Sequence, residues 1–337
     1  MPCAGKSCDG LDPTTATAPT SSSSRHSSVH CAQQRSICHL TQPPPTQSCA
    51  IARKGKHRVT KPRLERPALD QLARHAKNIR RHVLRMAAGR GQGYVGQGLD
   101  AADILAALYF GEMRHDPAQP DWPERDRFLL STGHYSIVLF AALAEAGVLN
   151  EAELDTYGAD GSRLEMSSLE TTPGVEITGG SLGHGLSLAA GMALGARLTG
   201  ATHRVFNFLS DGELQEGATW EAAMFAAHQR LDRLVAIVDV NRTQADGPLE
   251  DVLEVEPVAD KWRAFGWQAV EVNGNDLSEL VPALATTRRR GRKPRVIVCH
   301  TRLGYGVPLI MERERAHFVR VEADEWDEAS RQLERLA

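Results

Sequence analysis

Residues 204–247 read RVFNFLSDGELQEGATWEAAMFAAHQRLDRLVAIVDVNRTQADG and contain two apolar runs rich in β-branched and aromatic residues. The runs at 205–209 and 234–240 are nearly continuous in apolar residues, which is typical of strands buried in a parallel sheet. The first run is followed by Asp211 and the second by Asn241. Each predicted strand therefore ends next to a side chain that offers an oxygen atom.

The segment at 219–228 has the length and composition of one crossover helix between the two runs, so the two strand ends should lie side by side. Ligands of open α/β sheets bind just beyond the carboxyl ends of the strands. The carboxylate of Asp211 and the amide oxygen of Asn241 suit a hard cation. Because such a cation can hold a diphosphate, the two residues predict a cation-bound diphosphate site.

Helical and strand patterns alternate through the rest of the chain. Helices are predicted at 69–88, 101–110, 137–146, 186–198, 259–265 and 277–287, and strands at 128–130, 268–272 and 295–300. Asp100 is predicted to be the N-cap of the helix that starts at residue 101. The alternation predicts an α/β fold in which helices cover both faces of a parallel sheet.

The composition is that of a globular protein, with 42% hydrophobic and 24% charged residues in 337. No apolar stretch reaches the roughly 20 residues that a bilayer-spanning helix needs, and we expect a cytoplasmic location. The net charge of −3 hides an asymmetry, because residues 1–64 carry a balance of +7 and the remainder −10. The acidic remainder predicts small molecules or proteins as partners, rather than nucleic acid or a membrane.

Residues 1–66 are predicted to be a disordered extension and residues 67–337 a folded domain. The extension holds TTATAPTSSSSRHSS, PPPTQ and ARKGKHR, with little apolar material to offset the entropy of ordering. It resembles an organelle transit peptide in composition, but it lacks a clean amphipathic Arg helix, so an extension without function is the simpler interpretation. Five of the six cysteines lie there in spacings that match no zinc pattern, and Cys299 should be a buried hydrophobe.

Two further loops should line the same crevice as the strand ends. STGH at 131–134 follows a predicted strand, and SLGHG at 181–185 opens a predicted helix. Backbone N–H groups in Gly-rich loops at helix starts suit phosphate. Taken alone, each loop also has a structural explanation, because such glycines allow close packing and such histidines cap helices. In combination with Asp211, Asn241 and the acidic Glu216, they favour a binding site.

Together these segments resemble the N-terminal half of a transketolase, and more closely the N-terminal subunit of transketolases split into two polypeptides. The resemblance extends over residues 69–317 and is carried by AADILAALYF, STGHYSIVLFAALAEAG, TPGVEITGGSLGHGLSLAAGMALGARL, SDGELQEGATWEAAMFAA, VDVNRTQADG and KWRAFGWQAVEVNGNDLSEL. The family's motif for thiamin diphosphate is Gly-Asp-Gly followed at a distance by Asn. Asp211 and Asn241 match it at a separation of 30 residues, with Ser210 in place of the first glycine.

Two other families share the metal motif: the alpha subunit of 2-oxo acid dehydrogenases and deoxyxylulose phosphate synthase. TPGVEITGGSLGHG and FGWQAVEVNGNDLSEL favour transketolase over both. The resemblance therefore implies the thiamin-diphosphate-binding fold, and within it the domain that binds the diphosphate.

The resemblance also implies how the cofactor is held. Asp211 and Asn241 would bind Mg²⁺ or Ca²⁺, with the backbone carbonyl of Thr243 as a third protein ligand. Gly212 would let the backbone approach the diphosphate. The other positions implied for the cofactor are Glu213, Gly183, His184, Gly185 and His134.

The catalytic positions implied by the resemblance are His134, Glu216 and His317. His134 would contact the diphosphate or the substrate. Glu216 matches the family's interfacial glutamate, which couples cofactor sites across a dimer. His317 falls where the family has a substrate-side histidine.

The activity implied is that of a transferase that depends on thiamin diphosphate and moves a two-carbon ketol group from a ketose donor to an aldose acceptor. In this family the cofactor is activated by a glutamate of a pyrimidine-binding domain, for which this chain offers no matching segment. We therefore expect the chain to be inactive alone, to require a separate C-terminal subunit, and to form an α2β2 assembly.

Two positions depart from the family's pattern. Its Gly-His-Pro-Gly loop reads GYVG here, so Tyr94 replaces a histidine, and a phenol is a poorer base than an imidazole at neutral pH. A second Gly-His-Pro reads EMS, which places Met166 at the other histidine position.

Three interpretations of the function remain open: ketol transfer with an unusual sugar, decarboxylation of a 2-oxo acid such as pyruvate with acyl transfer, or a non-catalytic cofactor-binding protein.

Overall fold

A five-stranded parallel sheet in the order β2-β3-β4-β8-β7 forms the centre of the computed structural model, which describes residues 68–313 and 316–336. The predicted disordered extension and its five cysteines lie outside the described residues. The strands are β2 (Arg127–Leu130), β3 (Val205–Ser210), β4 (Leu234–Val240), β7 (Gln268–Asn273) and β8 (Arg295–His300). The predicted α/β fold with a parallel sheet is confirmed, and β3 and β4 are neighbours.

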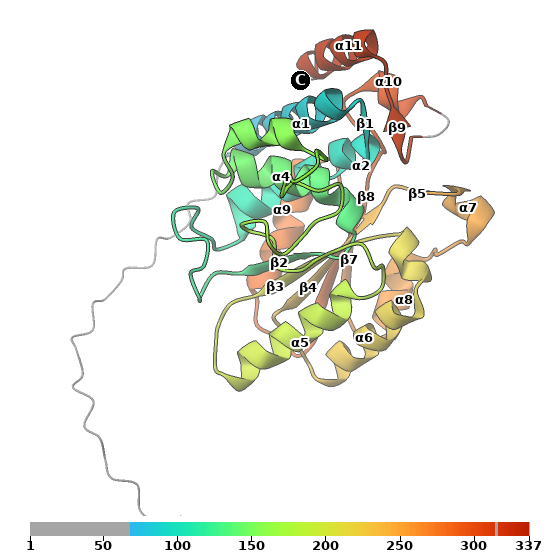
Figure 1. The fold of residues 1–337 in the computed structure, drawn as a ribbon. Helices are drawn as coiled ribbons and strands as arrows, with labels where there is room; N and C mark the ends of the chain where they lie inside the picture. Colours follow the sequence, from blue (N-terminus) through green and yellow to red (C-terminus); the bar gives the residue numbers. More distant parts are fainter. Residues whose placement is uncertain (1–67, 314–315, 337) are drawn as a thin grey trace, which may run out of the picture. The chain divides into compact units, whose positions relative to one another are not determined.

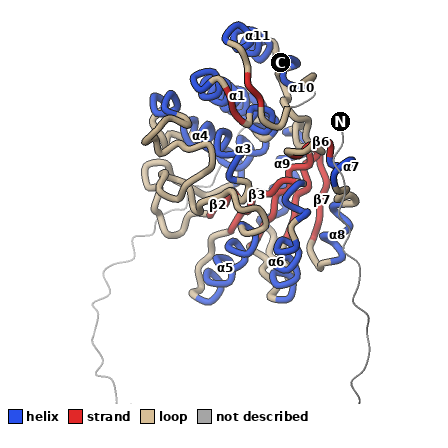
Figure 2. Tube along the Cα trace, turned by 45° about the vertical axis from the view of Figure 1, so that its right-hand side comes forward, coloured by secondary structure: helices blue, strands red, loops and turns tan. Residues whose placement is uncertain are grey.

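Helices cover both faces of the sheet (Figures 1 and 2). The first layer contains α1 (Leu69–Arg90), α3 (Ala102–Ala107), α4 (Ser136–Glu145) and α9 (Leu277–Ala285), and the second contains α5 (Gly185–Leu198), α6 (Gly217–His228) and α8 (Val258–Ala264). Along β3, Phe206 and Phe208 pack against the first layer, whereas Val205 and Leu209 pack against the second. Successive strand residues point to opposite faces, so burial of both faces explains the continuous apolar runs.

Short elements join these layers. They are α2 (Val95–Asp100), α7 (Leu249–Val252), α10 (Pro308–Met311) and α11 (Ala323–Glu334), with the short strands β1 (Gln92–Gly93), β5 (Thr243–Gln244), β6 (Gly247–Pro248) and β9 (Val319–Arg320). β1 pairs with β9 and β5 pairs with β6, both antiparallel. The pairing of β1 with β9 brings the loop after residue 93 beside residues near 318, although 225 positions separate them in sequence.

Three predictions about these elements need correction. Helix α1 continues to Arg90 rather than ending at residue 88, and it ends at Gly91, whose φ of 73° is left-handed. Asp100 does not cap a helix, because α3 has no side-chain cap and the Asp100 carboxylate bonds to Asn241 instead. The predicted helix 101–110 is interrupted, since α3 gives way to a π-type turn at Leu108–Glu112.

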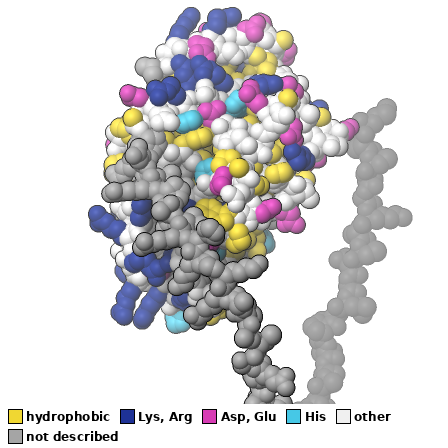
Figure 3. Space-filling view, turned by 90° about the vertical axis from the view of Figure 1, so that its left-hand side faces the viewer, with side chains coloured by type: hydrophobic (Ala, Val, Ile, Leu, Met, Phe, Trp, Pro, Cys, Tyr) yellow, Lys and Arg dark blue, Asp and Glu magenta, His cyan; other side chains and the backbone are white. Residues whose placement is uncertain are grey.

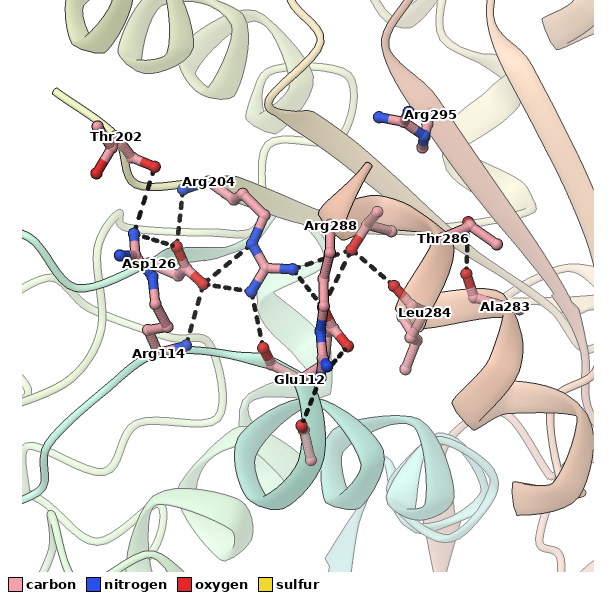
Figure 4. Close-up of polar contacts among 12 residues, drawn as sticks. Glu112, Arg114, Asp126, Thr202, Arg204, Ala283, Leu284, Thr286, Arg288 and Arg295 are labelled. Atoms are coloured by element: carbon pink, nitrogen blue, oxygen red, sulfur yellow. Dashed lines mark hydrogen bonds and ion pairs between the residues drawn. The ribbon is translucent and has the colours of Figure 1, made fainter. Parts of the chain in front are cut away.

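The amino-terminal ends of the strands carry a network of ion pairs (Figure 4). Arg204, just before β3, pairs with Asp126 at 2.6 Å and with Glu112. Arg288 also pairs with Glu112 at 2.8 Å, and Arg114 with Asp126 at 3.3 Å. Burial alone would raise the pKa of Asp126, but the neighbouring Arg204 lowers it below its usual range. The buried carboxylate of Asp126 is therefore held ionised by arginine.

The surface of the described residues is uneven in charge. On the face shown in Figure 3, Lys and Arg side chains gather toward the lower left, whereas elsewhere basic, acidic and apolar side chains are mixed. None of the helices in 68–313 and 316–336 combines the length and the apolar character needed to cross a bilayer.

Candidate functional site

Asp211 lies immediately beyond β3 and is almost fully buried, with 1% of its surface exposed. Its backbone N–H donates to the Asp239 carbonyl of β4 at 2.8 Å, which extends the ladder between the strands. Its carboxylate accepts the backbone N–H of Gly212 and that of Arg242, both at 2.7 Å. The carboxylate therefore bridges the two strand ends, as their predicted adjacency requires.

Asn241 follows β4 and lies at the centre of a buried polar cluster. Its amide nitrogen donates to Asp100 at 3.0 Å, to the Tyr135 hydroxyl at 3.1 Å and to Asp239 at 3.0 Å. Three oxygen partners fix the amide nitrogen on that side. The amide oxygen faces the other way and accepts the Thr243 backbone N–H at 3.1 Å. It is thus the amide oxygen that remains available to a cation.

Thr243 offers its backbone carbonyl on the same side. Thr243 lies opposite Pro248 in the β5–β6 pair. In the adjacent residue pair, Leu249 N–H donates a hydrogen bond to Arg242 C=O at 3.0 Å. This pattern makes residue 243 a non-hydrogen-bonded position, where both backbone groups point away from the partner strand. Its N–H reaches the Asn241 side chain, so its carbonyl lies on the edge that faces Asn241.

The carboxyl groups of this cluster lack positive partners. Burial, and then the charge of Asp239, raises the pKa of Asp211 to about 7. Burial raises the pKa of Asp239 to about 6, and burial followed by the charge of Asp239 raises that of Asp100 well above its usual range. None of the three has an ion pair with Lys or Arg among the described residues. A divalent cation would supply the missing charge, so the donor set fits the predicted metal.

The predicted ligands are one carboxylate, one amide oxygen and one backbone carbonyl. Within 68–313 and 316–336, no group of three or more His, Cys, Asp or Glu side chains is arranged to hold a metal ion. Such a cluster is not expected at the predicted site, because only one of its three ligands, Asp211, is a His, Cys, Asp or Glu side chain.

The SLGHG loop packs closely against this region. Gly183 N–H donates to Glu213 at 2.9 Å, and Gly185 N–H donates to the Ser131 hydroxyl at 3.0 Å. A Cβ atom on Gly185 would lie 2.2 Å from that hydroxyl oxygen, so no side chain fits there. Burial raises the pKa of Glu213 to about 7, although its bonds to Ser131 and Gly183 oppose the shift.

His184 and Glu216 are exposed, whereas Gly183 and Gly185 on either side of His184 are buried. Glu216 precedes α6 and touches the SLGHG loop, because a Cβ atom on Gly183 would lie 2.9 Å from the Glu216 Cβ. An exposed carboxylate at this position is accessible to another subunit, which is compatible with the predicted interfacial role.

Three rings from distant segments meet beside the cluster. The Tyr94 ring centroid lies 5.0 Å from that of His134 and 5.6 Å from that of His317, and His134 lies 5.5 Å from His317. The antiparallel pairing of β1 with β9 brings Tyr94 and His317 together. Burial, and then His317, lowers the pKa of His134 to about 3. His134 is therefore neutral at physiological pH.

Met166 lies on a loop that is fastened to the start of α4. The Ser136 hydroxyl donates to the Glu165 carbonyl at 3.1 Å, and Ser168 N–H donates to the Gly133 carbonyl at 3.2 Å. Met166 itself is partly buried against the core of the first helical layer. The loop thus runs beside His134, but no contact places the Met166 side chain with Tyr94.

The structure also contains buried residues that the sequence reasoning missed. Tyr135 donates to Asp239 at 2.7 Å, and Thr301, which follows β8, also donates to Asp239. Tyr135, Asp239 and Asp100 hold the Asn241 amide in place, and Thr301 supports Asp239. A signal was present in LVAIVDV at 234–240, where a carboxylate interrupts an otherwise apolar strand and therefore requires buried partners.

Comparisons with known proteins identify the family of the chain. The family described as "Transketolase, thiamine diphosphate binding domain" matches residues 72–334. A transketolase family protein of Sinorhizobium fredii is 53% identical over 262 residues, which cover 77% of this chain and 94% of the relative. The 6-deoxy-6-sulfo-D-fructose transketolase subunit of a Clostridium species is 39% identical, with 78% of this chain and 96% of the relative covered.

Solved transketolases share the fold. The enzyme of Campylobacter jejuni superposes with a TM-score of 0.74 at 27% identity, and that of Leishmania mexicana with 0.72 at 29%. In each case 80% of this chain is covered, but only 43% and 42% of the solved chain. The match of the family over most of the chain decides the identity: this protein belongs to the transketolase family of transferases and carries its thiamine diphosphate binding domain.

Proposed function

We propose that the chain is the N-terminal subunit of a two-subunit transketolase and that it binds thiamine diphosphate through a divalent cation. The observation that carries this proposal is the pair of strand ends at Asp211 and Asn241. There the buried Asp211 carboxylate accepts the Arg242 backbone N–H, while the Asn241 amide donates to Asp239 and accepts from Thr243. The neighbouring carboxyl groups of Asp100 and Asp239 have no ion pair with Lys or Arg among the described residues.

In this proposal Asp211, Asn241 and the Thr243 carbonyl hold Mg²⁺ or Ca²⁺, and the cation holds the diphosphate. Gly212 leaves its backbone accessible beside the diphosphate, and the loop with Gly183 and Gly185 lies next to it. When bound, thiamine diphosphate supplies the nucleophilic carbon that accepts and releases a two-carbon ketol group.

The residues of the chain position the reactants and control protons. His134 is neutral, so it donates or accepts a hydrogen bond at the diphosphate or the substrate without adding charge. Tyr94 and His317 lie against it and form the substrate side of the site in this proposal. Glu216 would meet the equivalent region of another subunit.

A partner subunit is the second part of the proposal. Two relatives of nearly the same extent are named as subunits, one of a 6-deoxy-6-sulfo-D-fructose transketolase and one of an apulose-4-phosphate transketolase from Actinobacillus succinogenes. This chain matches 96% of each. We propose that a separate subunit supplies a pyrimidine-binding domain with the glutamate that activates the cofactor, in an α2β2 assembly.

Reconstitution tests the proposal. The purified chain is mixed with thiamine diphosphate, Mg²⁺, a ketose donor and an aldose acceptor, with and without a transketolase C-terminal subunit. We expect product only when both proteins are present, and none when the chain carries Asp211→Asn. Turnover by the chain alone would show that no second protein is needed.

A second candidate substrate class has a specific observation in its favour. The place of the family's first substrate histidine is taken by Tyr94, which packs edge-on against His317 with an interplanar angle of 88°. This position has no base that is effective at neutral pH, which would suit decarboxylation of a 2-oxo acid such as pyruvate. Product formation from pyruvate, compared with hydroxypyruvate and a ketose phosphate, separates the two classes.

A further inference from the structure

A cavity of about 500 Å³ lies at the amino-terminal ends of β7 and β8. The opposite, carboxyl-terminal end of β8 leads to Thr301, which donates to Asp239 in the buried polar cluster around Asn241. A strand of six residues separates the two ends by roughly 20 Å, so the cavity is distinct from the site described above.

Every charged side chain that lines this cavity is an arginine: Arg263, Arg289, Arg290 and Arg295. Its wall also includes Ala269, Val270 and Ile297, which give it an apolar patch. We call it the arginine cavity. Four guanidinium groups around one hollow repel one another unless anions lie between them.

The carboxylates nearby serve only two of these arginines. Arg263 pairs with Asp260 at 2.6 Å and with Glu271 at 3.3 Å. Arg290 pairs with Asp232 at 3.1 Å. Among the described residues, no carboxylate lies within ion-pair distance of Arg289 or Arg295. The arginine cavity therefore has a surplus of positive charge.

Arg295 shows this surplus most clearly, because only 5% of it is exposed. One of its terminal nitrogens donates to the Asp232 backbone carbonyl at 3.2 Å. The Asp232 carboxylate instead accepts from Arg290 at 3.1 Å and from Gly291 N–H at 3.2 Å. Figure 4 shows Arg295 apart from the neighbouring ion pairs, with no dashed line to any residue drawn. A buried cation without a carboxylate is costly unless another anion is present.

The ion pairs next to the cavity provide a contrast. Arg204 pairs with the buried carboxylates of both Glu112 and Asp126, and Arg288 pairs with Glu112. There each buried carboxylate has at least two arginine partners within 4.0 Å. Each arginine of this network therefore has a carboxylate partner, whereas Arg289 and Arg295 have none within ion-pair distance among the described residues.

A second cavity of about 200 Å³ adjoins the first through Arg290, which lines both. Its other charged residues are Arg197, Arg233 and Asp232. Burial, and then the charge of Arg290, lowers the pKa of Arg233 below the usual range of a guanidinium. Burial also lowers the pKa of Arg295; the charge of Asp232 opposes this shift, and that of Arg289 adds to it. In the free protein these arginines therefore disfavour one another's charge.

We propose that the two cavities form a binding site for a small polyanion, a molecule that carries two or more phosphate groups. Guanidinium groups bind phosphate with paired, charge-assisted hydrogen bonds. Arg290, at the wall shared by the cavities, would contact both halves of the ligand. The apolar patch of Ala269, Val270 and Ile297 would take its carbon skeleton. The site is independent of the proposed cofactor and of the proposed reaction.

Calorimetric titration of the full chain tests this site. Inorganic tripolyphosphate is the first probe, in buffer with EDTA so that no divalent cation supports binding at Asp211. We expect saturable binding that weakens as NaCl rises from about 0.05 to 0.3 M. Arg289→Gln, an exposed change that breaks no ion pair, should raise the Kd roughly fivefold or more. Arg289→Gln combined with Arg290→Gln should raise it further.

The controls decide between this site and others. Arg331→Gln removes an equal charge from an exposed arginine on α11 that pairs with Glu328, and it should leave the Kd unchanged. Asp211→Asn should also leave it unchanged, which excludes binding at the strand ends. Equal weakening in Arg331→Gln and Arg289→Gln would overturn the proposal, as would absence of saturable binding.

Two further probes identify the source of the phosphates. A sugar bisphosphate and a nucleoside triphosphate are titrated in the same buffer, and tighter binding of one over tripolyphosphate assigns the carbon skeleton to the apolar patch. If a single-stranded RNA oligonucleotide binds and loses affinity in Arg289→Gln while the small polyphosphates do not bind, the small-molecule proposal is wrong.

Discussion

Asn241 connects the polar groups that lie beyond β4. Its amide nitrogen reaches Asp100, Tyr135 and Asp239, and its oxygen is turned toward Thr243. A single amide therefore orients the oxygen that is proposed to bind the cation, and it also lies between carboxyl groups that would otherwise repel one another. A substitution of Asn241 by an aliphatic residue would remove both effects at once.

His134 is predicted to remain neutral over the whole range in which the protein works. Burial, and then His317, lowers its pKa from 6.5 to about 3. Between these values the unfolded chain binds a proton that the folded chain does not, so this residue makes the folded state less stable as pH falls from about 6.5 toward 3. In NMR spectra of ¹³C-labelled histidine, the His134 signals should not shift between pH 5 and 8. A titration midpoint between pH 6 and 7 would contradict this.

Tyr94→His is predicted to restore activity toward ordinary ketose phosphates. An imidazole beside His134 and His317 can transfer a proton at neutral pH, and such groups typically contribute roughly 100-fold or more. In the reconstituted complex, kcat/KM for a ketose phosphate relative to pyruvate should rise at least about tenfold. Tyr94→Phe is the matched control, because it keeps the ring and adds no base. An unchanged ratio in Tyr94→His would show that position 94 does not select the substrate.

For single residues, the sequence predicted that Asp211 and Asn241 lie close together. This prediction depends only on topology, because neighbouring parallel strands bring their carboxyl ends together. It did not predict Asp100 as a partner of Asn241, since local pattern favoured a helix cap and the contact spans 141 positions. Tyr135 was missed for the same reason, because its partners Asp239 and Asn241 are distant in sequence. Contacts between residues that are distant in sequence depend on how the elements pack, and local sequence patterns carry no information about that packing.

Among the elements, the strands were the most predictable. β4 and β8 have the predicted bounds, because continuous apolar runs identify strands that are buried on both faces. Helix ends were less predictable. α1 passes Gly89 and ends only at Gly91, where the left-handed backbone is adopted. The short β1 and β9 carry too few residues for any periodic signal, yet they bring Tyr94 to His317.

The junction of β2, β3 and α9 depends on Arg204. Arg204→Met would leave the buried carboxylates of Asp126 and Glu112 with fewer partners, and loss of one partner of a buried ion pair costs about 3–5 kcal/mol. Chemical denaturation should show a decrease of that size in the free energy of unfolding. Arg331→Gln, at an exposed ion pair, should change it by at most about 1 kcal/mol. Equal stability of Arg204→Met and wild type would show that the network contributes nothing.

At the scale of the whole molecule, the two ends of the sheet have opposite character. Among the described residues, the carboxyl-terminal end collects carboxyl groups without an arginine or lysine ion pair, whereas the amino-terminal end of β7 and β8 collects four arginines, of which Arg289 and Arg295 have no carboxylate within ion-pair distance. The first arrangement fits a cation with its diphosphate, and the second fits a phosphorylated small molecule. The sheet thus separates the proposed cofactor from the proposed polyanion by the length of its strands.

Calorimetric titration of thiamine diphosphate into the chain, with and without Mg²⁺, tests the central proposal most directly. We predict binding that requires Mg²⁺ and that weakens roughly tenfold to 100-fold in Asp211→Asn, since one charged ligand is lost. Asp251→Asn makes the same change at an exposed position of α7 and should bind like wild type. Equal affinity in Asp211→Asn and wild type, or binding that is indifferent to Mg²⁺, would contradict the proposed cofactor site.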